Sequence, residues 1–141
     1  MTRVDFYLLN DMTGSKLLLV CRLADKAYRL GHHSYILTAD AAEAAALDAL
    51  LWTFAAGSFV PHGVYRTDAE VPAQPVLIGH APPPAACHQL LISLGPQVAD
   101  FFSRFTRVAE IVGGTADEKA AARERFRFYR ERGYTLETHT I

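Results

Sequence analysis

The segment from His88 to Leu94 limits the fold most strongly, because it is short and mostly apolar. A strand of this kind needs cover on both faces, which is the situation of strands in the parallel sheets of α/β proteins. Other short apolar runs alternate along the chain with segments of helical periodicity, a pattern typical of strands joined by crossover helices. The sequence therefore predicts an α/β fold, a three-layer sandwich with a mostly parallel central sheet.

Local signals predict where the elements begin and end. Asp40 is a suitable N-cap for the second helix, and Thr115 with Glu118 matches a capping box at the start of the last helix. Gly31 and Gly133 are suitable helix stops. Strands are expected at residues 4–9, 34–38, 76–79, 88–94, 107–112 and, as an edge strand, 134–140; helices are expected at 15–30, 40–52, 96–105 and 115–132. Irregular segments are expected at 54–63, rich in large apolar groups, and at 81–85, where three prolines favour an exposed extended loop.

Size, charge and cysteine content exclude several classes of protein. The 141 residues suit one domain, 1–141, and the net charge of −1 argues against a protein that coats DNA through general electrostatics. The sequence shows no signal-peptide pattern and no apolar run of membrane-spanning length, so we expect a cytoplasmic protein without a membrane partner. Cys21 and Cys87 lie far apart beside apolar runs, and we expect buried free thiols.

The motifs of nucleotide binding and catalysis are missing. Gly14-Ser15-Lys16 resembles the end of a phosphate loop, but Leu9 stands where that motif needs a glycine and Leu17 where it needs a hydroxyl. Gly113-Gly114 could present amides to an anion, although a plain strand-to-helix turn is the simpler interpretation. The histidines lack the neighbouring carboxylates or cysteines of a zinc site, and there is no G-x-S-x-G motif. We expect no catalytic residues, no metal and no cofactor.

The last helix concentrates positive charge. The segment from Lys119 to Arg132 holds six of the 14 lysine and arginine residues. Four of them fall within an arc of about 80° on the helix, and we call this set the basic stripe: Lys119, Arg123, Arg127 and Arg130. Ala122, Phe126 and Tyr129 are expected beside it. This combination predicts a surface that holds an acidic ligand with an apolar part, whereas a solvated charged face is the alternative.

Five segments of the sequence resemble those of a known family, and they occur in order from the first expected strand to the last helix. They are Val4-Asp-Phe-Tyr-Leu-Leu-Asn, Trp52 with Ser58-Phe-Val-Pro-His62, Leu91-Ile-Ser-Leu94, Ala99-Asp-Phe-Phe102 and Ala122-Arg-Glu-Arg-Phe-Arg-Phe-Tyr-Arg130. Together they resemble the chi subunit of bacterial DNA polymerase III. The loop Asp11–Lys16 is shorter than in that family, and residues 63–86 match it poorly.

The resemblance implies a fold like that of Rossmann and P-loop domains, without a phosphate loop. It also implies a non-catalytic accessory subunit of the replicative holoenzyme. Such a subunit pairs with the psi subunit, which tethers it to the clamp loader, and binds the acidic, phenylalanine-ended C-terminal tail of the single-stranded DNA-binding protein. An accessory helicase can take the place of psi, and DNA would be contacted mainly indirectly.

The resemblance also assigns two sets of residues. The tail-binding set is Val112, Lys119, Arg123, Phe126, Arg127 and Arg130. The psi-binding set is Trp52, Phe59, Val60, Pro61 and His62. For Trp52 and Phe59, packing in the core is the competing interpretation.

Two other functions stay open at this point. A direct single-stranded DNA-binding module would use the same arginines on phosphates and Phe126 or Tyr129 for stacking. A degenerate nucleotide-binding protein would agree with the fold but not with the missing phosphate loop.

Overall fold

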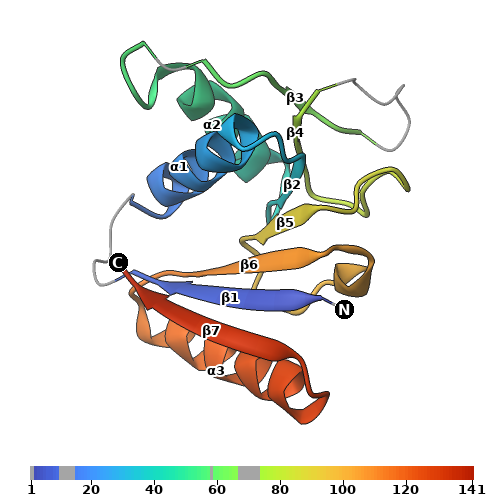
Figure 1. Ribbon diagram of the computed structural model, residues 1–141. Coiled ribbons are helices and arrows are strands. Elements are labelled where there is room, and N and C mark those ends of the chain that lie inside the picture. Colours follow the sequence, from blue (N-terminus) through green and yellow to red (C-terminus); the bar gives the residue numbers. More distant parts are fainter. Residues whose placement is uncertain (1, 10–14, 58, 67–73) are drawn as a thin grey trace.

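The structure is a computed structural model that describes residues 2–9, 15–57, 59–66 and 74–141. In this part of the chain a seven-stranded sheet has the order β3-β4-β2-β5-β6-β1-β7, and every neighbouring pair is parallel (Figure 1). The strands are β1 (Arg3–Leu8), β2 (Ser34–Leu37), β3 (His62–Val64), β4 (Val76–Gly79), β5 (Leu90–Ser93), β6 (Arg107–Val112) and β7 (Thr135–Thr140).

Helices cover the two faces of the sheet unequally. Helices α1 (Ser15–Arg29) and α2 (Ala41–Thr53) pack on one face, and α3 (Ala116–Glu131) packs on the other. Figure 1 shows α1 and α2 over the half of the sheet that contains β2 to β5, so none of the described helices lies in front of the same face of β1 and β7. The predicted sandwich with a parallel sheet is confirmed.

Alternation along the strands divides the apolar residues between two cores. In β5, Ile92 belongs to the core under α1 and α2, whereas Leu91 belongs to the core on the α3 side. In β1, Val4 and Phe6 point to the α3 side. Asp5, between them, therefore faces the other side and lies on the part of the sheet that no helix covers. The prediction that β5 is buried on both faces is correct.

The predicted helix ends agree well with the structure. Asp40 accepts a hydrogen bond from the amide of Glu43, 2.8 Å away, and Thr115 accepts one from the amide of Glu118 at 3.1 Å. Gly31 and Gly133 follow α1 and α3 with φ of 81° and 78°, a region that favours glycine. None of the described helices is both long and apolar enough to cross a membrane.

Three local predictions are wrong. The segment 96–105 forms only a 3-10 turn, Phe102–Arg104, since its buried residues Ala99, Phe102 and Phe105 recur every three residues and so match the tighter turn. Residues 54–63 contain the start of β3, which was missed because the strand is three residues long. Residues 81–85 are not fully exposed: Pro83 and Pro84 are buried. The loop is held against the sheet, where the hydroxyl of Tyr35 donates to the carbonyl of Ala81 at 2.6 Å.

Candidate functional site

A buried polar cluster fixes the rotation of α3 on the sheet. Nε of Arg125 donates to Oε1 of Glu110 at 3.0 Å, and the hydroxyl of Tyr129 donates to Oε2 of the same carboxylate at 2.6 Å. Arg125 also donates to the carbonyl of Pro96. Burial raises the pKa of the Tyr129 hydroxyl above its ordinary value, and the neighbouring Glu110 carboxylate raises it further. The prediction that Tyr129 lies on the surface beside the basic stripe is wrong, because its ring is fully buried.

With Arg125 and Tyr129 turned inward, the basic stripe faces outward. Lys119, Arg123, Arg127 and Arg130 are all exposed. Arg127 pairs with Glu124 one turn away at 3.4 Å, so part of its charge is offset by a neighbour that is itself exposed. An exposed pair of this kind contributes little to stability and can be exchanged for a ligand carboxylate.

A pocket of about 400 Å³ lies between β1, β7 and the first half of α3. Four residues of the predicted tail-binding set line it: Val112, Lys119, Arg123 and Phe126. Arg127 and Arg130 lie further along the helix and are not among its lining residues. The pocket combines an apolar lining with two cationic side chains, which suits a ligand that carries both a carboxylate and an apolar group.

Several residues of this pocket were missed from the sequence. Phe6 and Leu8 of β1 contribute to its apolar lining, and Thr138 and Thr140 of β7 also line it. The ring of Phe126 meets that of Phe6 edge-on, with centroids 5.4 Å apart. The sequence could have indicated these residues through the alternation of side chains along a strand, since in both strands every second residue points to the α3 side. It could not show that β1 pairs with β7, which brings the two sets together.

The residues of the predicted psi-binding set divide into exposed and buried. Trp52 is 53% exposed and Phe59 is 62% exposed, and their ring centroids lie 5.7 Å apart. We call these two rings the aromatic patch. Pro61 is half-buried. Core packing is therefore wrong as an interpretation of Trp52 and Phe59.

Val60 and His62, in contrast, are buried. Val60 is buried in the core under α1 and α2. His62 is buried, and its ring centroid lies 4.5 Å from that of Trp52. Its Nδ1 lies 2.7 Å from the carbonyl oxygen of Val60 and its Nε2 lies 3.1 Å from that of Asp48, so the ring joins the loop to α2.

A side chain at the start of α1, where the partial phosphate-loop motif ends, pairs with a side chain at the start of α3. Residues 10–14, which include Gly14 of the partial phosphate-loop motif, lie outside the described residues. Lys16 donates to Oε2 of Glu118 at 3.2 Å, and Thr115 donates to Oε1 of the same carboxylate at 3.0 Å. Burial alone would raise the pKa of Glu118, but the hydrogen bonds from Thr115 and Lys16 outweigh it and lower the pKa. The Glu118 carboxylate lies so close to Gly113 that a Cβ at this position would require the Glu118 side chain to move.

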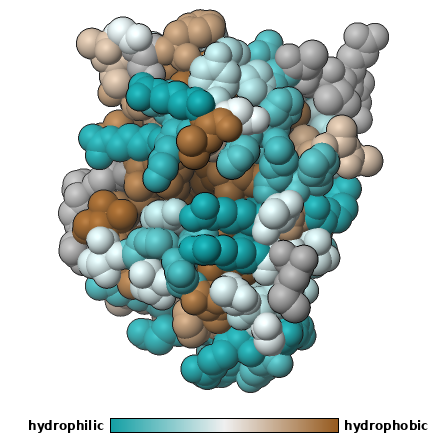
Figure 2. Space-filling view, viewed as in Figure 1, coloured by the Kyte–Doolittle hydropathy of each residue, from teal (hydrophilic) through white to brown (hydrophobic). Residues whose placement is uncertain are grey.

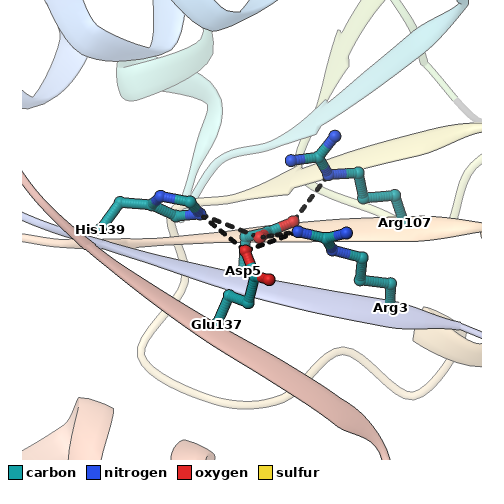
Figure 3. A network of polar contacts seen from close by, with 5 residues as sticks. All are labelled: Arg3, Asp5, Arg107, Glu137 and His139. Carbon is teal, nitrogen blue, oxygen red and sulfur yellow. Dashed lines mark hydrogen bonds and ion pairs between the residues drawn. The ribbon is translucent and has the colours of Figure 1, made fainter.

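On the uncovered face of β1 and β7, charged side chains form a network (Figure 3). Nε of Arg107 donates to Oδ2 of Asp5 at 2.6 Å, and Nε2 of His139 lies 3.0 Å from its Oδ1. Arg3 bridges Asp5 and Glu137. Burial would raise the pKa of Asp5, but these partners outweigh it and lower the pKa. Asp5, Glu137 and His139 are spaced like metal ligands. The two guanidinium groups beside them already neutralise the carboxylates and would repel a cation.

Comparisons with a family model and with individual proteins agree on one family. Residues 1–137 match the family described as DNA polymerase III chi subunit, HolC. The DNA polymerase III subunit chi of Pseudomonas aeruginosa is 43% identical over 142 residues, covering 100% of this chain and 98% of the relative. The subunit of the same name from Escherichia coli is 35% identical over 145 residues, covering 99% of each.

A solved structure with little sequence similarity has a related architecture. The crystal structure of T4 UvsW aligns with a TM-score of 0.71 at 6% identity, covering 99% of this chain and 41% of that protein. At this identity the likeness concerns the fold alone. The family match and the relatives, in contrast, extend over nearly the whole sequence at levels that define a family. The chain therefore belongs to the chi subunit family of DNA polymerase III.

Proposed function

We propose that this chi subunit is an adaptor that holds two protein partners on separate surfaces. As a chi subunit it is a non-catalytic accessory subunit of DNA polymerase III. In the proposal, the pocket beside α3 binds the acidic, phenylalanine-ended tail of the single-stranded DNA-binding protein. The aromatic patch binds psi, or an accessory helicase in its place, and psi connects the subunit to the clamp loader. It acts in the cytoplasm and contacts DNA mainly through these partners.

The observation that supports the tail site most is the coincidence of Lys119, Arg123 and Phe126 around one pocket. A C-terminal phenylalanine has a ring and a carboxylate on the same residue. The ring would enter the apolar part, between Phe126 and Val112. The carboxylate would pair with Arg123, whose guanidinium can donate two parallel hydrogen bonds. Acidic residues further back in the tail would pass along the basic stripe toward Arg127 and Arg130.

The aromatic patch supports the second surface. Two large rings exposed side by side are uncommon on a surface that stays in water, and aromatic side chains are enriched at the centres of protein interfaces. The patch lies at the C-terminal end of α2 and in the loop before β3, whereas the tail pocket lies between α3, β1 and β7. Because α2 and α3 pack on opposite faces of the sheet, both partners could be held together.

Calorimetric titration of the full chain with an acidic peptide that ends in phenylalanine tests the tail site. Arg123→Ala should weaken binding by about 1–3 kcal/mol, the range for a lost charge-assisted hydrogen bond. The same peptide with a C-terminal amide, which lacks the terminal carboxylate, should bind the wild-type chain more weakly by a similar amount of free energy. Arg22→Ala is the matched control, because Arg22 is an exposed arginine on α1 and should not affect binding.

The same titration separates the proposal from its competitors. Added salt should weaken peptide binding, because the site is exposed and screened. Oligothymidylate and magnesium-ATP should give no calorimetric signal at concentrations at which the peptide saturates the protein. If Arg123→Ala and Arg127→Ala both leave peptide affinity unchanged, the tail binds elsewhere. If oligothymidylate binds more tightly than the peptide and loses affinity in these variants, the basic stripe is a nucleic-acid site.

A further inference from the structure

A groove of about 250 Å³ runs between the last turns of α1 and the strands β6 and β1. It lies on the face of the sheet opposite the tail pocket and is not formed by the aromatic patch. The space-filling view shows a recessed hydrophobic area in this region with hydrophilic side chains around it (Figure 2). Neither proposed interaction uses this groove, which we call the α1 groove.

The apolar part of the α1 groove is open to water. Leu30, the residue after α1, is 63% exposed although it borders the groove. Leu23 and Leu90, both half-buried, line it from the helix and from the sheet. Its volume is sufficient for one or two side chains and too small for a folded element. An apolar recess of this size suits a single large aliphatic or aromatic residue of a ligand.

The polar part of the groove carries one sign of charge. Its lining includes Lys26, His32 and Arg107 and no acidic residue. Carboxylates in the surrounding region are already engaged: Asp5 by Arg107 at 2.6 Å, Asp25 by Arg29 at 2.9 Å and Glu137 by Arg3 at 2.6 Å. Since Asp5 partly offsets the charge of Arg107, the exposed Lys26 contributes most of the positive charge of the lining. The groove therefore favours a ligand that brings negative charge beside an apolar side chain.

We propose that the α1 groove binds a short segment of a partner protein in which a large apolar residue is flanked by aspartate or glutamate. The apolar residue fills the recess between Leu23, Leu30 and Leu90. The flanking carboxylates pair mainly with Lys26, because the charge of Arg107 is already partly offset by Asp5. In this proposal the segment is internal to the partner and needs no terminal carboxylate, unlike the tail that we assign to the pocket beside α3.

A nucleic acid suits the groove less well than a peptide. Single-stranded nucleic acid is usually held by aromatic rings with open faces. Two rings line the groove, those of Tyr7 and His32. Tyr7 is stacked on His139 with centroids 4.7 Å apart and planes at 18°, so one of its faces is covered. The apolar recess itself is lined by leucine and alanine side chains, which match a protein side chain better than a base.

Amide chemical shifts of the full chain, measured by NMR during titration with the blocked peptide acetyl-Asp-Leu-Asp-amide, test the proposal. Shifts are expected at Lys26, Leu30 and Leu90. The uncharged peptide acetyl-Asn-Leu-Asn-amide should bind about fivefold more weakly, as expected for the loss of exposed ion pairs. Both peptides lack a free C-terminal carboxylate, which separates this site from the tail pocket.

Variants of exposed residues complete the test. Lys26→Glu and Leu30→Ser should each weaken the charged peptide several-fold, and thermal melting should verify that both variants fold. Arg123→Glu is the matched control and should leave these shifts unchanged. The proposal is overturned if the shifts centre on Val112 and Phe126, if no shifts arise at millimolar peptide, or if the two peptides bind equally. It is also overturned if oligothymidylate shifts the same amides more strongly, or if Leu30→Ser abolishes self-association of the chain detected by ultracentrifugation.

Discussion

Arg125 on α3 and Glu110 on β6 form an ion pair with 3.0 Å between Nε and Oε1, and both residues are almost completely buried. The pair is positioned by the fold: Glu110 lies on the α3 side of β6, and Arg125 lies on the inward face of the helix. The same helix turn directs Arg123 and Arg127 outward. Hence the buried pair decides which charges α3 presents to a partner.

The first prediction concerns this pair. Glu110→Gln should lower the free energy of unfolding by about 3–5 kcal/mol, because it leaves the Arg125 charge buried without its counterion. Urea denaturation measures the effect. The double variant Glu110→Leu with Arg125→Met should recover most of the loss, since it removes both charges together. Equal destabilisation by the double and single variants would show that the pair is not the cause.

A pH dependence is expected from Asp5. The pKa of Asp5 in the folded protein lies below its ordinary value of 3.8, because hydrogen bonds from His139 and Arg107 outweigh burial. A lowered pKa means that the ionised carboxylate stabilises the fold at pH above 3.8, and that this contribution is lost as pH falls through the folded value. The stability difference between the wild type and Asp5→Asn should therefore be constant near neutral pH and shrink in acid. A difference that grows in acid would contradict the lowered pKa.

The two thiols should differ in reactivity. Cys21 is fully buried, and burial raises the pKa of its thiol to about 12. Cys87 is half-buried, and burial raises its pKa less. Since the thiolate is the reactive form, a disulfide reagent at mildly alkaline pH should label Cys87 slowly and Cys21 not at all in the folded chain. In urea both should react. Rapid labelling of both thiols without urea would mean that the core around Cys21 opens readily.

Much of the fold could be predicted because its signals are local. Asp40, Thr115, Gly31 and Gly133 each act on a helix end within a few residues, and the apolar run of β5 indicates burial on both faces by itself. The wrong predictions concern features that depend on contacts between distant parts of the chain. The 3-10 turn at Phe102–Arg104 and the buried prolines depend on which part of the sheet lies beneath them, and that is decided by residues distant in the sequence.

The candidate sites follow the same division. The basic stripe could be predicted because helical periodicity alone brings Lys119, Arg123 and Arg127 to one face. The burial of Tyr129 could not, because its partner Glu110 lies 19 residues earlier on a neighbouring strand. Likewise, Phe6 and Thr138 enter the tail pocket only because β1 pairs with β7. For the aromatic patch, the sequence identified the right segment but could not separate the exposed rings from the buried Val60 and His62.

The last prediction concerns the aromatic patch, where a role of Phe59 in binding can be separated from a role in stabilising the fold. Phe59 is 62% exposed, so Phe59→Ala should change the free energy of unfolding by no more than about 0.5 kcal/mol, as is usual for surface substitutions. The same variant should weaken binding of psi, or of a helicase in its place, by about 2–4 kcal/mol, the cost of truncating an aromatic residue at an interface centre. Binding of the acidic peptide beside α3 should stay unchanged.

Two further variants make this result interpretable. Leu30→Ala removes another exposed large apolar side chain, from the α1 groove, and should leave psi binding intact. His62→Ala removes the buried ring that connects the loop to α2, so it should lower the melting temperature as well as psi binding. Thermal stability and both affinities are measured for every variant. If Phe59→Ala lowers stability and weakens both partners in parallel, then Phe59 supports the fold and the model of two independent surfaces fails.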